Sequence, residues 1–160
     1  MKDYDELWNQ YAIEFNNKLE SANGGDWNKL DEVEQEIAAL WKLTADMYSA
    51  GFDEFFLNWG YECYSYAMRG IKRVADADSG MKETSCNEVY ELFDNAYTKV
   101  FARFENDERI KAYADIIKYF TADDEEILEE TFDIFDEKLG PLFCESAYKF
   151  YCEKLNKRVY

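Results

Sequence analysis

The sequence contains no histidine among its 160 residues. Histidine is the most common general base in enzymes, and it completes the serine and cysteine triads and the Glu-x-x-His pairs of di-iron bundles. Those catalytic templates are therefore excluded. The chain also lacks a G-x-x-x-x-G-K-[ST] phosphate loop and a dinucleotide-binding glycine fingerprint, which excludes the corresponding nucleotide sites. We predict a non-enzymatic protein with no catalytic residue, no metal site and no cofactor.

Proline and glycine are scarce as well, with one proline and seven glycines. A many-stranded sheet needs more turn residues than this, and the apolar residues recur at helical spacing almost throughout. We predict an all-α fold, a bundle of about seven or eight helices that forms a single domain over residues 1–160. Aromatic residues make up 18% of the chain, too many for a disordered acidic polymer and enough for a genuine core.

The chain has no long apolar run. Residues 1–6 show no basic segment followed by an apolar stretch, and no later run has the length of a membrane-spanning helix. We expect a cytoplasmic protein that does not contact membranes. Cys63, Cys86, Cys144 and Cys152 lack C-x-x-C spacing, so we expect reduced cysteines that are mostly buried as small hydrophobic side chains.

Turn signals in the first half divide the helical pattern into segments. The cluster 23–26 (N-G-G-D) ends a first helix, and Gly51 is well placed to end a second helix that begins near Leu30. A short aromatic segment, 52–59, precedes a helical stretch from about 61 to 74. We expect residues 75–82 to form a loop.

The second half begins with the clearest helix boundary. Residues 85–88 (S-C-N-E) have the form of a capping box and start a helix that continues to about residue 104. We expect Asp107 to cap a shorter helix that ends near Phe120. We expect Thr121 or Asp123 to cap the helix that follows it. The Gly140-Pro141 pair then stops that helix and starts the last one, because proline suits the first helical position.

Positive charge is also in short supply, because 35 acidic residues face 18 basic ones and the formal net charge is -17. A chain with this charge repels nucleic acid and anionic membranes, which need clustered Lys and Arg, and attracts basic proteins. An acidic composition kept only for solubility would give the same net charge. The charge alone therefore does not decide between a protein that binds a basic partner and one that is acidic only for solubility.

The densest charge lies in residues 123–137, which contain nine acidic residues and no Lys or Arg. At about 100° per residue, seven of them share one half of a helix. These are Glu125, Glu126, Glu129, Glu130, Asp133, Asp136 and Glu137. They span roughly 18 Å, about one charge per 2.6 Å, compared with about one per 1.7 Å in duplex DNA. Because no Lys or Arg lies between these acids, the segment favours a binding surface over an ordinary solvated helix face.

A second acidic row would bring this charge density close to that of duplex DNA. The second helix offers one, formed by Asp31, Glu32, Glu34 and Glu36. We predict that both rows bind a basic partner protein.

Carboxylates can also hold magnesium, as in helical nucleoside-triphosphate pyrophosphohydrolases, which carry E-E-x-x-E followed by E-x-x-D. The pieces occur here as Glu125-Glu126-x-x-Glu129 and Glu91-x-x-Asp94, in the reverse order. A chain with 35 acidic residues produces such spacings by chance, so a magnesium-dependent hydrolase stays the weakest alternative.

Residues 50–58, A-G-F-D-E-F-F-L-N, resemble the G-G-F-x-Q-F-F-x-N signature of the DNA-mimic-protein-19-like domain family. Ala50 replaces a glycine and Glu54 a glutamine. Residues 67–71 (A-M-R-G-I) are similar to that family's A-L-x-x-I-G region, with Gly and Ile exchanged. We interpret the signature as structural, because glycine permits a left-handed turn and phenylalanines anchor a segment in the core. Its structural residues are Gly51, Phe52, Phe55, Phe56 and Asn58. We expect Asn58 to cap or tie the next turn.

The resemblance implies an all-α fold. For a characterised member it also implies imitation of duplex DNA, by which the protein occupies the DNA-binding surface of a transcription factor. Our first hypothesis is therefore a DNA-mimic or charge-mimic inhibitor, monomeric or homodimeric, that binds a basic protein and no nucleic acid. The second is an immunity-type or adaptor protein that blocks a toxin or enzyme through a less salt-sensitive interface.

Overall fold

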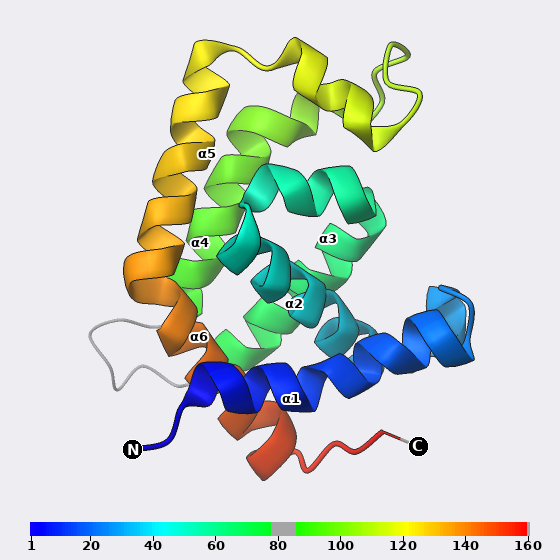
Figure 1. The fold of residues 1–160 in the computed structure, drawn as a ribbon, viewed down its shortest axis with the longest axis vertical. Coiled ribbons are helices and arrows are strands. Elements are labelled where there is room, and N and C mark those ends of the chain that lie inside the picture. The colour runs from blue at the N-terminus through cyan, green and yellow to red at the C-terminus, as the bar shows by residue number, and fades with distance from the viewer. Residues whose placement is uncertain (78–85, 160) are drawn as a thin grey trace.

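The computed structural model describes residues 1–77 and 86–159, and this part of the chain is helical without any β-strand (Figure 1). Its six α-helices are α1 (Tyr4–Asn17), α2 (Glu32–Ser49), α3 (Phe52–Ala77), α4 (Cys86–Ala96), α5 (Ala122–Ile134) and α6 (Gly140–Ala147). Gly60 interrupts α3, so the described residues contain seven helices if its two parts are counted separately. The predicted all-α bundle is confirmed.

Shorter helical segments extend or connect these six helices. Those with π geometry are η1 (Lys18–Ala22), η3 (Tyr97–Phe101), η6 (Phe135–Leu139) and η7 (Tyr148–Lys154). Those with 3₁₀ geometry are η2 (Trp27–Lys29), η4 (Ala102–Phe104) and η5 (Tyr113–Tyr119). No helix among the described residues has both the length and the apolar composition needed to cross a membrane.

The helix containing α5 does not end at the predicted Gly140-Pro141 boundary, although α6 begins there. Gly140 keeps a right-handed helical backbone, and its N–H donates to the carbonyl of Phe135 five residues earlier. This π-type bond shifts the hydrogen-bonding pattern just ahead of Pro141, which has no N–H to donate. Residues 122–154 therefore follow one helical path instead of two separate helices.

Two other predicted boundaries differ from the structure. Residues 75–77, expected in a loop, belong to α3, which continues to Ala77, and residues 78–82 lie outside the described residues. Ser85, the expected cap of α4, also lies outside them. Asp107 caps no helix: it accepts hydrogen bonds from the backbone N–H and guanidinium of Arg109, and the 3₁₀ helix η5 starts only at Tyr113.

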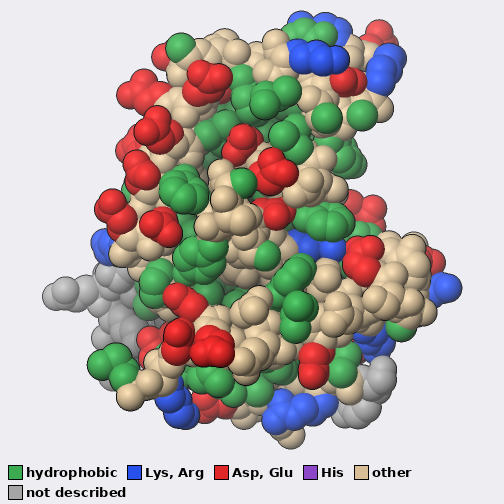
Figure 2. Space-filling view, in the orientation of Figure 1, with side chains coloured by type: hydrophobic (Ala, Val, Ile, Leu, Met, Phe, Trp, Pro, Cys, Tyr) green, Lys and Arg blue, Asp and Glu red, His purple; other side chains and the backbone are tan. Residues whose placement is uncertain are grey.

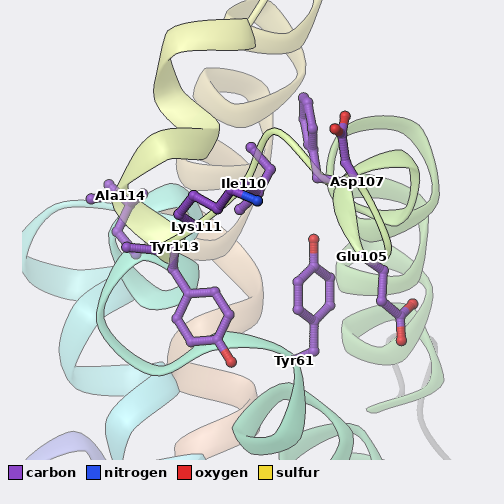
Figure 3. Close-up of a pocket in the computed structure, with 10 residues that line it drawn as sticks. Tyr61, Glu105, Asp107, Ile110, Lys111, Tyr113 and Ala114 are labelled. Carbon is purple, nitrogen blue, oxygen red and sulfur yellow. The ribbon is translucent and has the colours of Figure 1, made fainter.

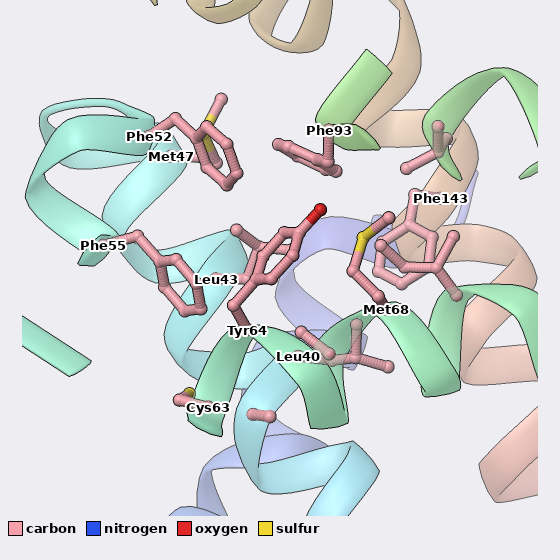
Figure 4. Close-up of a cluster of buried hydrophobic side chains, with 14 of the residues drawn as sticks. Leu40, Leu43, Met47, Phe52, Phe55, Cys63, Tyr64, Met68, Phe93 and Phe143 are labelled. Carbon is pink, nitrogen blue, oxygen red and sulfur yellow. The ribbon is translucent and has the colours of Figure 1, made fainter. Parts of the chain in front are cut away.

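The phenylalanines of the signature lie in an aromatic core between α2, α3 and α4 (Figure 4). Phe52, Phe55 and Phe56 are fully buried, and the rings of Phe56 and Phe101 stack with their centroids 4.0 Å apart. Aromatic rings supply much of the buried apolar area of a small domain. The segment after Gly51 therefore anchors α3 against its neighbours.

The end of the signature is tied to α2 by polar contacts. The amide of Asn58 lies 3.4 Å from the carboxylate of Asp46, and the indole N–H of Trp59 donates to the same oxygen at 2.9 Å. Gly51 precedes this segment with φ = +124°, a conformation that side-chain-bearing residues rarely adopt. The signature thus combines a glycine turn, a buried aromatic group and a tie back to α2.

A buried carboxylate joins α2, α3 and η7. Glu36 is fully buried, and it accepts hydrogen bonds from Arg69 Nε at 2.8 Å, from Arg73 Nε at 2.6 Å and from the Tyr151 hydroxyl at 2.9 Å. A Cβ on Gly70 would lie 3.0 Å from that hydroxyl, so glycine gives the helices room to approach. Pairing and hydrogen bonds offset the large cost of removing the carboxylate from water.

Replacing Glu36 by glutamine leaves Arg69 and Arg73 without a buried counter-charge. We expect the free energy of unfolding to fall by about 3 kcal/mol, measured by urea denaturation. The matched control is Glu32→Gln, which removes a carboxylate that pairs with the same arginines but is 63% exposed. That change should lower stability by less than about 1 kcal/mol. Equal losses in the two variants would contradict the role assigned to burial.

Candidate functional site

Helix α5 is fixed at its N-terminus by a capping box and an ion pair. The Thr121 hydroxyl accepts from the Asp124 N–H at 3.1 Å, and the Asp124 carboxylate accepts from the Thr121 N–H at 2.8 Å. Thr121, and not Asp123, is therefore the cap. Arg103 donates to both carboxylate oxygens of Asp124, which is only 4% exposed. Burial raises the pKa of Asp124, but the bonds from Arg103 and Thr121 outweigh it and lower the pKa overall.

The inner face of α5 and η6 sets the orientation of the outer one. Leu128, Thr131, Phe135 and Leu139 recur at helical spacing and are buried. The Phe135 ring lies 5.6 Å from that of Phe93 on α4 and 5.3 Å from that of Tyr48 on α2, measured between ring centroids. Because these contacts fix the rotation of the helix, residues on the opposite half face the solvent.

The outward face carries the seven acids predicted from the sequence, here called the acidic stripe. Its members are Glu125, Glu126, Glu129, Glu130, Asp133, Asp136 and Glu137, and all seven are exposed. Within the described residues, none of them takes part in an ion pair. Figure 2 shows Asp and Glu side chains along the edge of the molecule formed by α5. The stripe is an uncompensated line of negative charge.

The second acidic row expected on α2 is not formed. Glu34 is 3% exposed and pairs with Lys18, while Glu36 is fully buried against Arg69 and Arg73. Helix α2 packs against both α1 and α3, so acids on more than one of its faces lie against neighbouring helices. The predicted exposure of Glu34 and Glu36 is therefore wrong.

The other two acids of that row are exposed but engaged. Asp31 pairs with Lys157 at 2.6 Å, and Glu32 pairs with Arg73 at 3.1 Å. Asp31 also caps α2, accepting from the Glu34 N–H at 2.8 Å. A carboxylate held by a lysine or arginine of the same chain contributes little negative potential at the surface. The second row therefore adds little to the negative charge that the acidic stripe presents at the surface.

Sequence reasoning missed a groove beside the stripe, here called the α3–α5 groove. Its lining residues are Ala50, Gly51, Asp53, Ile117, Phe120, Glu125, Leu128, Glu129 and Phe132. The groove brings Asp53, from the first turn of α3, to the same cavity as Glu125 and Glu129. Asp53 occupies one of the two variable positions of the signature, but no pattern along the chain connects it to residues more than 70 positions away.

A second cavity, of about 540 Å³, lies beside the break in α3 (Figure 3). The rings of Tyr61 and Tyr113 line it with their centroids 6.1 Å apart. A Cβ on Gly60 would lie 2.1 Å from the Tyr113 ring, so this wall requires glycine. The Tyr61 hydroxyl donates to the Phe101 carbonyl at 2.9 Å, and burial raises the pKa of Tyr61.

The carboxylates at this cavity are already engaged. Glu105 accepts from the Tyr97 hydroxyl at 2.7 Å, and Asp107 pairs with Arg109 at 2.6 Å. In the acidic stripe, by contrast, no lysine or arginine of the described residues pairs with any of the carboxylates. The cavity at Tyr61 and the stripe are therefore electrostatically different surfaces.

The described residues contain no group of three or more His, Cys, Asp or Glu side chains that could hold a metal ion. Glu91 and Asp94 on α4 thus form no such group with the glutamates of α5. Cys63, Cys86 and Cys144 are buried and Cys152 is half-buried, as predicted. Burial raises the pKa of Cys63.

A family model described as DMP19-like protein matches residues 28–157. The chain belongs to the DMP19-like protein family. The DMP19-like match includes the signature on α3, the whole acidic stripe and the residues that join Glu36 to α3 and η7. The resemblance identified from residues 50–58 is thus confirmed. No curated protein and no solved structure matches the chain.

Replacing Asp124 by asparagine tests how firmly α5 is anchored. The amide keeps an oxygen for the cap but loses the charge that binds Arg103, so at pH 7 we expect the free energy of unfolding to fall by roughly 1.5–3 kcal/mol. The native pKa of Asp124 lies below its ordinary value of 3.8. The stability it contributes is therefore complete above that value and is lost as the pH falls through the native pKa.

The measurement is urea denaturation of both proteins at neutral and acidic pH. The difference between wild type and Asp124→Asn should shrink as the solution becomes more acidic than about pH 4. Asp123→Asn is the control, because Asp123 is exposed and belongs to no ion pair of the described residues. A difference that stays constant from neutral to acidic pH would contradict the ionic anchor.

Proposed function

We propose that the chain is an acidic protein-binding module that occupies the basic surface of a DNA-binding protein, such as a transcription factor. The observation that carries the proposal is the acidic stripe, seven exposed acids on one helical face without a cationic partner in the described residues. Membership of the DMP19-like protein family supports it. Binding at this surface would exclude DNA from the partner and so inhibit it.

The physical basis is complementarity of charge. The stripe presents about one negative charge per 2.6 Å of helix, and a lysine- and arginine-rich surface that binds DNA phosphates would be attracted to it. Such attraction steers the encounter and sets the relative orientation of the two proteins. The net charge of -17 repels nucleic acid and anionic lipid, so the proposed partner is a protein.

Repulsion between the carboxylates of the stripe supports a role in binding another molecule, because it does not help the chain to fold. Like charges at i,i+4 on a helix each cost a few tenths of a kcal/mol, so Glu125 with Glu129 and Glu126 with Glu130 slightly destabilise α5. The paired acids of α2, in contrast, hold the fold together. A row of carboxylates that weakens its own helix gains a favourable interaction only when a basic surface is present.

Reversing the charge of Glu126, Glu130, Asp133 and Glu137 to lysine tests the stripe. The control reverses four exposed acids elsewhere in the chain, Glu14, Glu62, Glu108 and Glu153, which changes the net charge equally. Each protein is used as bait in a lysate of the source organism, and the captured protein is identified by mass spectrometry. We expect the stripe variant to lose the partner that the wild type and the control retain.

The purified partner then allows a direct competition experiment. In an electrophoretic mobility shift assay, the wild-type chain should release the partner from its DNA, whereas the stripe variant should not. Binding should weaken more than about tenfold between low and high salt.

Other outcomes would select among the alternatives. Equal loss of capture in both four-fold variants would mean that only net charge matters. Capture that survives both high salt and reversal of the stripe would favour an immunity-type or adaptor interface. Magnesium-dependent turnover of a nucleoside triphosphate that Glu129→Ala and Glu91→Ala abolish would favour the hydrolase.

A further inference from the structure

The α3–α5 groove combines an apolar floor with an acidic rim. Ile117, Phe120, Leu128 and Phe132 supply the apolar surface, and Ile117 is 52% exposed although it is a large hydrophobic residue. The groove encloses about 330 Å³. Ligand pockets commonly measure about 300–1,000 Å³, so this groove is at the small end of the range. Its size suits one inserted side chain better than a folded segment.

The rim of the groove carries three carboxylates from two helices. Asp53 belongs to α3, while Glu125 and Glu129 lie one helical turn apart on α5. No lysine or arginine lines the groove, and none of the three carboxylates takes part in an ion pair within the described residues. The groove therefore has negative charge on both sides and no internal cation to balance it.

Glycine at position 51 leaves space in the groove that a side chain would take. A Cβ built there would lie 3.1 Å from Asp53 Oδ1 and 3.9 Å from the Phe132 ring, both of which line the groove. It would therefore occupy space between the carboxylate and the aromatic ring. The signature glycine thus has a second consequence besides its turn, because it leaves room beside Asp53.

We propose that the α3–α5 groove is an anchor site for one arginine side chain of the basic partner, an inference that rests on the proposed function. An arginine matches both parts of the groove. Its aliphatic stem covers apolar surface, its planar guanidinium stacks on an aromatic ring such as Phe132, and its N–H groups donate to carboxylates on either side.

Other side chains match the groove less well. An apolar side chain would cover the floor but would remove water from Asp53, Glu125 and Glu129 without replacing its hydrogen bonds. An acidic side chain is repelled. A lysine supplies charge but lacks the planar face that stacks on Phe132 and the fork that binds a carboxylate through two bonds. The groove therefore discriminates among basic partners, which the stripe, attracting any cationic surface, does not do.

The test compares fluorescein-labelled nona-arginine and nona-lysine peptides, titrated with the full chain and followed by fluorescence anisotropy. We expect the arginine peptide to bind at least about fivefold more tightly. Asp53→Asn removes one rim carboxylate with little change of shape and should weaken arginine binding about fivefold or more. The matched control is Glu130→Gln, which removes one charge from the stripe outside the groove. Its effect should stay below about twofold.

Ile117→Ala examines the apolar floor separately. This exposed side chain contributes little to the core, so the variant should keep the thermal stability of the wild type. We expect it to weaken binding of the arginine peptide about twofold while leaving the salt dependence unchanged, because no charge is altered.

The outcomes separate this inference from the proposed function. Equal binding of the two peptides, together with equal effects of Asp53→Asn and Glu130→Gln, would overturn the arginine anchor and leave the stripe as the binding surface. If the arginine peptide shows no salt-sensitive binding, the anchor is overturned. The proposed function fails in a different experiment, the capture from lysate, if reversing the charge of the stripe does not affect capture of the partner.

Discussion

The buried carboxylate of Glu36 is the interaction on which the arrangement of the helices depends. Removing a carboxylate from water costs several kcal/mol, and only good geometry with additional hydrogen bonds offsets this. The two arginines of α3 and the hydroxyl of Tyr151 supply that geometry. Any packing that separated α2, α3 and η7 would leave the charge unpaired. The pairing of α2 with α3 in turn fixes the turn at Gly51 and the start of α3 beside α5.

This arrangement of the helices gives the acidic residues two different roles. Asp31, Glu32, Glu34 and Glu36, at the start of α2, pair with lysines and arginines of the same chain and hold helices together. Those of α5 face the solvent without such partners in the described residues and repel one another. A net charge of -17 counts both kinds alike. Because the paired acids are not available to another molecule, the proposed binding surface is smaller and more localised than the composition suggests.

The signature and the stripe, separate features in the sequence, meet at the α3–α5 groove. The phenylalanines of the signature anchor α3 in the core, and Asp53 lines the same groove as Glu125 and Glu129 of α5. The capping box and Arg103 fix the N-terminus of α5. A groove of mixed apolar and acidic character results. In the proposal, the stripe attracts and orients a basic surface and the groove selects one side chain of it, so the two are complementary.

The sequence by itself determined whatever depends on neighbours within a few turns of helix. Helical periodicity with few glycines and prolines predicted the all-α fold, and the spacing of apolar residues in α5 predicted which acids face the solvent. Tertiary structure alone decided the burial of Glu34 and Glu36 and the proximity of Asp53 to Glu129. Glu36 meets Arg69 across 33 positions of the chain. Periodicity shows that residues share a face, but it does not show which other helix covers that face.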